Sequence, residues 1–130
     1  MPLTDAGALV CCKLVMGDVQ TIFNATNARL GVGDSTAAFA KAQTDLQSAS
    51  NKQRVGMDAT FPKRTGSTLQ FSATYSTAQG NYAWNEWGVF NNATPGAGEM
   101  LSRKVEPGNV LGTKPNTQTW QLVADCVFGA

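Results

Sequence analysis

The sequence predicts a mainly β fold, an antiparallel β-sandwich or Greek-key sheet preceded by two short N-terminal helices. Its 130 residues make up the length of one domain. Apolar and polar residues alternate with a period of two from residue 53 onward, and short polar turns separate the alternating segments. We therefore expect a single domain over residues 1–130, in which a helical and loop part (1–50) packs on a β-sheet core (53–130).

Residues 4–17 predict the first helix. Thr4 can cap its start, Asp5 suits its first turn and Gly17 can end it. The spacing of the apolar residues assigns four of them to its inner face: Ala6, Leu9, Val10 and Leu14.

The second helix is expected after a short strand over residues 28–33. Asp34 or Ser35 would cap this helix, and its inner face would hold Phe39, Ala42 and Leu46. The glycines at 31 and 33, followed by Asp34, resemble part of a phosphate-binding turn, but the third glycine of that motif is missing. A tight strand-to-helix turn is therefore the favoured interpretation.

Five strands are expected in the second part, over residues 53–60, 68–76, 82–91, 99–105 and 120–128. Residues 61–67, 78–81, 91–98 and 107–109 are interpreted as connections, because they are polar or contain glycine and proline. The alternation assigns six side chains to one core: Leu69, Phe71, Trp87, Val89, Trp120 and Leu122.

The composition argues against several classes of function. Lys and Arg number 10 against 9 Asp and Glu, so no basic surplus is available for a nucleic-acid partner. His is absent, which removes the commonest general base and the commonest transition-metal ligand. We expect no enzymatic activity, no cofactor and no metal. The sequence contains no apolar run of about 20 residues, the length that a membrane-spanning helix needs, so no membrane helix is predicted.

Glu86 lies between two tryptophans and is the carboxylate with the most informative surroundings. It could serve as a catalytic acid, remain in solvent, or pair with Arg103 or Lys104 across a sheet. The ion pair is the favoured interpretation, because no second carboxylate stands at a spacing that pairs with it.

Three cysteines, an odd number, exclude a fully paired intrachain disulfide framework. Buried thiols in a reduced compartment are the favoured interpretation. If an intermolecular disulfide exists, we expect Cys11 or Cys12 to form it, since N-terminal segments can reach a neighbouring chain. Cys126 alternates with core residues and is expected to be buried and outside any bridge.

The aromatic residues around position 84 are interpreted first as core. Tyr82 and Trp84 are the candidates for an interface or for a surface on which sugar rings stack, because Trp and Tyr are enriched at both.

Several segments resemble, in the same order, a family of small structural proteins of tailed-bacteriophage virions. They are residues 30–39 (LGVGDSTAAF), 52–58 (KQRVGMD), 83–91 (AWNEWGVFN), 100–105 (MLSRKV), 111–115 (LGTKP) and 119–122 (TWQL). The resemblance spans about residues 28–123 and does not include the cysteines. It implies a virion component without enzymatic activity.

On this resemblance, the expected function is that of a capsid decoration or cement protein on the outer head surface. The principal partner would be the major capsid protein. A homo-oligomer, with a trimer favoured, is expected because the charged fraction is only 15% and the exposed faces are rich in Ser, Thr, Asn and Gln, which suits polar contacts between copies. Two alternatives remain open: a tail or tail-fibre module that contributes to receptor binding, and a lectin-like glycan-binding module.

Overall fold

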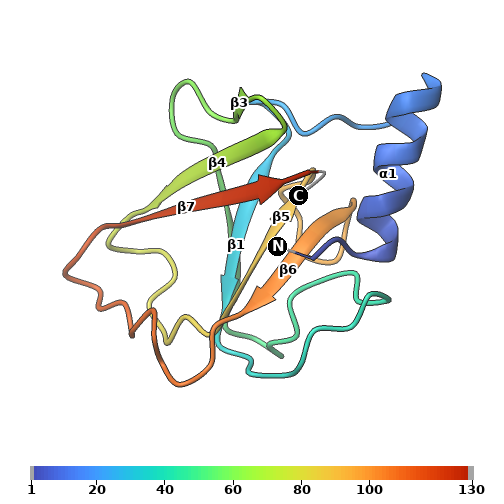
Figure 1. Ribbon diagram of the computed structural model, residues 1–130. Helices are drawn as coiled ribbons and strands as arrows, with labels where there is room; N and C mark the ends of the chain where they lie inside the picture. Colours follow the sequence, from blue (N-terminus) through green and yellow to red (C-terminus); the bar gives the residue numbers. More distant parts are fainter. Residues whose placement is uncertain (1, 129–130) are drawn as a thin grey trace.

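The structure, a computed structural model, describes residues 2–128 as two antiparallel sheets and one helix (Figure 1). The predicted mainly β class is confirmed. One sheet has the strand order β2-β1-β5-β6 and the other the order β3-β4-β7. The elements are α1 (Asp5–Met16), β1 (Arg29–Gly33), β2 (Lys52–Gly56), β3 (Lys63–Thr65), β4 (Thr68–Tyr75), β5 (Glu86–Phe90), β6 (Met100–Val105) and β7 (Trp120–Val127).

Helix α1 begins and ends as the sequence predicts, but it turns a different face inward. The Thr4 side chain accepts a hydrogen bond from the Gly7 amide, and Gly17 ends the helix with φ +74°. Val10 is buried as predicted, and so is Gly7, whereas Leu9 and Leu14, also predicted to face inward, are 54% and 44% exposed. A Cβ atom at Gly7 would lie 2.2 Å from the Leu101 carbonyl oxygen of β6. The helix therefore packs against β6 through its smallest residue rather than through its leucines.

The predicted second helix is absent from the structure. Residues 34–51 form an irregular loop that runs below the sheet in the view of Figure 1. The amides of Ser35, Gln47 and Ser48 donate to the Glu86 carboxylate instead of to helical carbonyls. The Asp34 carboxylate, expected to cap the helix, accepts hydrogen bonds from the Ser48 hydroxyl and the Asn51 amide.

The connection predicted over residues 61–67 contains the short strand β3. Lys63 pairs with Gln70, and Thr65 with Thr68, so that β3 and β4 form a hairpin. Gly66 stands in its turn with φ +58°, a conformation that glycine adopts without steric cost. Because β3 is short and fully exposed, no hydrophobic alternation marks it in the sequence.

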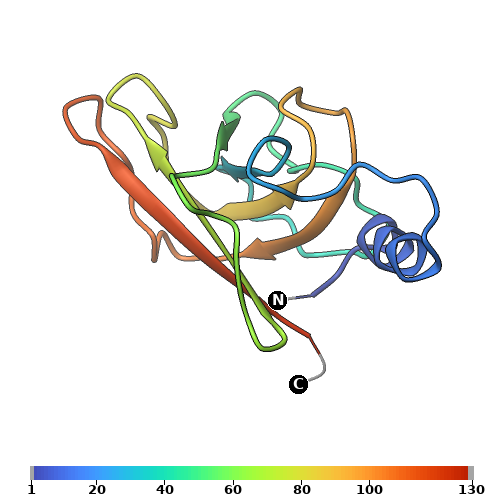
Figure 2. The ribbon, with the colours of Figure 1, turned by 90° about the horizontal axis from the view of Figure 1, so that it is seen from above.

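Both sheets contribute to one hydrophobic core, which lies between the layers seen from above in Figure 2. Four of the six side chains predicted to point inward are buried, namely Phe71, Trp87, Val89 and Leu122, and the other two, Leu69 and Trp120, are partly buried against this core. The buried Tyr75 hydroxyl of β4 donates a 2.6 Å hydrogen bond to the Leu30 carbonyl of β1 and so links the two sheets.

Candidate interaction site

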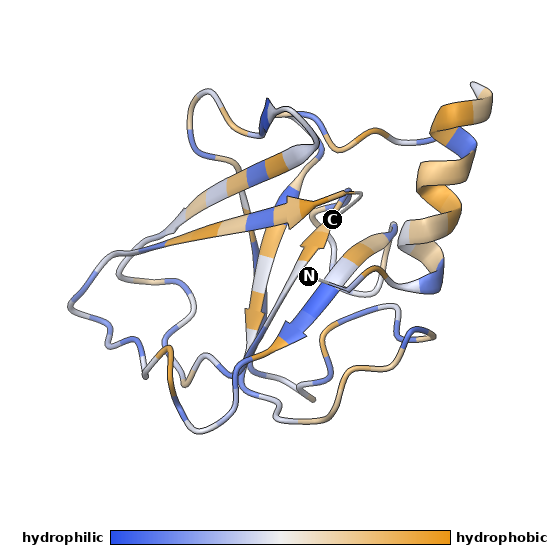
Figure 3. Ribbon diagram, in the orientation of Figure 1, coloured by the Kyte–Doolittle hydropathy of each residue, from blue (hydrophilic) through white to orange (hydrophobic). Residues whose placement is uncertain are grey.

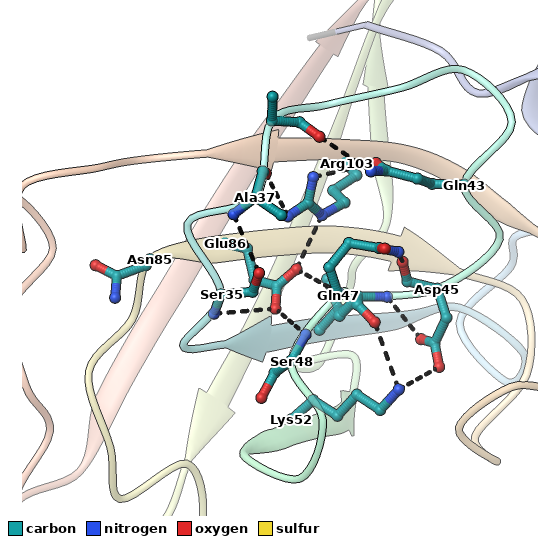
Figure 4. A network of polar contacts seen from close by, with 12 residues as sticks. Ser35, Ala37, Gln43, Asp45, Gln47, Ser48, Lys52, Asn85, Glu86 and Arg103 are labelled. Carbon is teal, nitrogen blue, oxygen red and sulfur yellow. Dashed lines mark hydrogen bonds and ion pairs between the residues drawn. The ribbon is translucent and has the colours of Figure 1, made fainter.

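The only charge pair that the described residues bury completely is Glu86 with Arg103 (Figure 4). Glu86 begins β5 and Arg103 lies in the neighbouring strand β6, where it pairs with Gly88. The Arg103 Nε donates to Glu86 Oε1 over 2.8 Å, and both side chains are 0% exposed. The predicted cross-strand ion pair is confirmed.

The loop over residues 34–51 supplies a partner to every polar side-chain atom of this pair except the Arg103 Nε, which donates to Glu86 itself. The Glu86 carboxylate accepts amides of Gln47 at 2.7 Å, Ser48 at 2.9 Å and Ser35 at 3.3 Å. The remaining Arg103 nitrogens donate to the Gln43 side chain and to the Ala37 carbonyl. A carboxylate that is buried and fully hydrogen-bonded has no free lone pair for a substrate. The cluster therefore fixes the loop and offers no catalytic site.

A second charged group fastens the same loop to the loop that follows β5. The Asp45 carboxylate accepts hydrogen bonds from Lys52 and Arg54, and the Arg54 guanidinium lies 3.7 Å from the centre of the Phe90 ring. Burial acts to raise the pKa of Asp45, but the two cations outweigh it and the pKa is lowered. Arg54 also donates to the Asn92 and Ala97 carbonyls. This group, too, is structural.

The structure places the two candidate stacking aromatics in the core or at its border. Trp84 is 3% exposed, its ring edges meet Tyr75 and Trp120, and its Nε1 donates to the Gly80 carbonyl. Trp84 is thus a core residue, in agreement with the favoured interpretation of the sequence, and its ring has no exposed face for an interface or for stacking on a sugar. Tyr82 is partly buried, and its hydroxyl donates to the Val32 carbonyl.

Most of the exposed large apolar side chains of the described residues lie on α1 and in the segment that follows it. The described exposed apolar side chains here are Leu9 54%, Leu14 44%, Val15 86%, Met16 77%, Val19 100% and Ile22 47%. We call these six residues, with Cys12, the α1 surface. Figure 3 shows α1 hydrophobic along most of its length, at the border of the molecule. On an ordinary monomer surface, exposed apolar side chains are scattered singly. Their concentration in one part of this chain indicates an interaction site.

Of the two cysteines named as candidates for an intermolecular disulfide, Cys12 belongs to the α1 surface and Cys11 stands next to it in the chain. Cys12 is exposed and Cys11 is half-buried, and with Val15 and Met16 they line a hollow of about 330 Å³. Burial and the neighbouring Cys12 raise the pKa of Cys11, and burial raises the pKa of Cys126 to about 11. The structure thus places Cys12 where a neighbouring chain could reach it and buries Cys126 at 3% exposure.

We expect the three thiols to react with Ellman's reagent at pH 8 in the order Cys12, Cys11, Cys126. Cys12 is the accessible thiol, whereas burial withholds the thiolate of the other two. The Cys12→Ser variant should lose the fastest phase. A fast phase that survives in Cys12→Ser and disappears in Cys126→Ser would contradict the assignment.

Sequence reasoning missed the α1 surface because it sought one inner face for the helix. A signal was nevertheless present. Between Asp5 and Asp18 the only charged residue is Lys13, so the helix is apolar on all sides. A helix of this kind is normally buried all round, which α1 is not in the single chain.

No group of three or more metal-ligating side chains occurs within residues 2–128, and no helix of that part is long and apolar enough to cross a membrane. In comparisons with protein-family models, curated proteins and solved structures, no family, protein or structure matches the chain.

Proposed function

We propose that the chain is a non-enzymatic structural component of a tailed-phage virion, specifically a decoration protein on the outer surface of the head. In this proposal the two sheets are the layers of a β-sandwich that serves as scaffold. The chain is made in the host cytoplasm and resides in the particle, and its principal partner is the major capsid protein.

The observation that carries the proposal is the α1 surface. Its six apolar side chains are 44–100% exposed and all fall within residues 9–22. Apolar side chains gathered in this way mark sites of contact with other proteins. Uncovered, this area would favour aggregation. A stable contact with another protein would cover this surface, and the protein that forms the capsid shell can provide such a contact.

The segments that resemble phage structural proteins support a structural role as well. Residues 83–91 and 100–105 contain Glu86 and Arg103, and residues 30–39 contain Ser35 and Ala37, which bind that pair. The resemblance therefore lies in side chains and backbone that hold the fold together. No alternative function is favoured by a specific contact of the described residues.

The test locates the chain in particles and perturbs the α1 surface. Particles purified from the encoding host are labelled with an antibody against the chain and viewed by electron microscopy. We expect label on the heads. The Val15→Lys/Met16→Lys variant should reduce the number of copies per particle at least about tenfold, because lysines cannot enter a dry contact.

The matched control is Val110→Lys, which alters a valine of 73% exposure far from α1 in the sequence and should leave the copy number unchanged. Particles without the chain would overturn the proposal. Label confined to tails would replace it with the tail-module alternative.

A further inference from the structure

The four outer edges of the two sheets are protected to different degrees. An open edge exposes unpaired N–H and C=O groups, and proteins usually shorten, charge or cover it. Strand β3 has three residues, two of them Lys63 and Arg64. The N-terminal segment covers β6, since Leu3 bridges Ser102 and the Thr4 amide donates to the Leu101 carbonyl. Strand β2 has five residues, and the chain after it bonds to β4 from Asp58 to Ser72.

Strand β7 is the exception. It has eight residues and pairs with β4 on one side alone among the described elements. Neither proline nor lysine occurs in it, and its register with β4 runs without a bulge from Tyr75↔Trp120 to Thr68↔Val127. Its single charged residue is Asp125, which accepts a hydrogen bond from the Gln70 side chain of β4.

The register shows which backbone groups of β7 point outward. The Phe128 amide donates to the Ser67 carbonyl at the end of the ladder. Hydrogen-bonded residues alternate in an antiparallel pair, so Leu122 and Ala124 direct their backbone groups toward β4. The residues that alternate with them direct their backbone N–H and C=O groups away from β4, toward the open edge. They are Gln121, Val123, Asp125 and Val127. For these four, the described part of the chain supplies no backbone partner.

We propose that the open edge of β7 pairs with β7 of a second copy of this chain, antiparallel and about a two-fold axis at Ala124. The two three-stranded sheets then form one continuous sheet. In this register Val123 lies opposite Asp125 of the second copy, and Gln121 lies opposite Val127. All four outward residues of each strand are therefore hydrogen-bonded.

The neighbouring registers are less favourable. An axis at Val123 leaves Val127 without a partner, and an axis at Asp125 places two carboxylates directly opposite each other, which is destabilising. The strand is thus complementary to itself in one register. Val123 and Val127, 49% and 52% exposed, add apolar contact on the outer face of the joined sheet. This inference does not rest on the virion proposal, because it concerns the purified chain.

The first experiment measures the mass of the purified full-length chain by light scattering after size exclusion. We expect a dimer of the 13.7 kDa chain, rather than the trimer that the sequence analysis favours. Val123→Pro should give a monomer, because the Val123 amide points away from β4 and its loss spares the β4–β7 ladder. Val123→Asp should also give a monomer, because it places its carboxylate directly opposite the Asp125 carboxylate of the second copy, and it decides the matter if the proline variant does not fold.

Two controls test whether the dimer contact lies on β7. Val110→Asp makes the same change off the strand and should remain a dimer. Met16→Lys alters the surface used by the proposed function and should remain a dimer too, so the two proposals fail separately. A wild-type monomer, a trimer, or a dimer that persists in Val123→Asp would overturn the inference.

A second experiment tests the register in a Cys11→Ser/Cys12→Ser background. Chains with Val123→Cys are mixed with chains with Asp125→Cys and treated with oxidised glutathione. Each protein disulfide that forms converts one glutathione disulfide into two glutathione thiols. Directly opposed residues lie about 5.5 Å apart between Cα atoms, within disulfide range, whereas like residues are offset beyond it. We expect cross-linked dimers in the mixture and not in either variant alone; cross-linking of Val123→Cys with itself would refute the register.

Discussion

Replacing Arg103 with Met is expected to lower the free energy of unfolding by about 3–5 kcal/mol, which is the cost of breaking a buried ion pair by removing one partner. The Glu86 carboxylate would remain at 0% exposure without its cation. Domains are stable by about 5–15 kcal/mol, so this loss is a large part of the total. Urea unfolding followed by tryptophan fluorescence measures it, with Trp87 next to Glu86 as a probe.

Lys104→Met is the matched control, because it removes a positive charge from the neighbouring position of the same strand. Lys104 is about half exposed and pairs with Glu106 at 3.0 Å, and surface pairs of this kind contribute less than about 1 kcal/mol. Equal losses of unfolding free energy for Arg103→Met and Lys104→Met would show that burial of the Glu86–Arg103 pair does not determine its contribution to stability.

A double variant separates the two roles of the Glu86 carboxylate, which are to pair with Arg103 and to accept hydrogen bonds from the amides of the loop. An isolated buried pair can often be replaced by apolar residues without loss of stability. Here Glu86→Leu/Arg103→Met should remain destabilised, because the amides of Gln47 and Ser48 lose their acceptor. Hydrogen exchange at these two amides should become faster. Full recovery of stability in the double variant would mean that the loop is held by other contacts.

The parts of the fold that the sequence predicted are those encoded locally. The strands follow from alternation, and the bounds of α1 follow from Thr4 and Gly17, whose capping contacts span a few residues. The Glu86–Arg103 pair could also be predicted, because consecutive strands usually neighbour each other. Arg103 lies opposite Gly88, so it stands diagonal to Glu86 on the same face of β5 and β6.

The parts that it missed depend on residues far apart in the chain. The prediction of a second helix was wrong because the amides of Gln47 and Ser48 donate to Glu86, which lies 39 and 38 residues away in the sequence. The inner face of α1 depends on the fit of Gly7 against Leu101, which no helical periodicity reports. The open edge of β7 follows from strand order, and strand order is a property of the whole fold.

The glycines of β1 show the same dependence. Their predicted role was to permit a tight turn before a helix, but both lie within the strand and neither has a positive φ. Their role is to leave room for side chains of the neighbouring strand β5. A Cβ atom at Gly31 would lie 2.8 Å from the Phe90 ring, and one at Gly33 would lie 2.4 Å from Glu86 Oε2.

Gly33→Ala is therefore expected to destabilise the protein by about 2–4 kcal/mol, through overpacking and through displacement of the carboxylate from its donors. Gly56→Ala is the control, since it makes the same change in the adjacent strand β2, where the nearest atom to the added methyl group is an Arg29 nitrogen at 3.5 Å, an ordinary contact. That variant should differ from wild type by less than about 1 kcal/mol. Urea unfolding of the two variants side by side measures the difference. A difference between them of less than about 0.5 kcal/mol would mean that the Glu86 carboxylate can move aside without loss, and that the loop over residues 34–51 does not depend on its position.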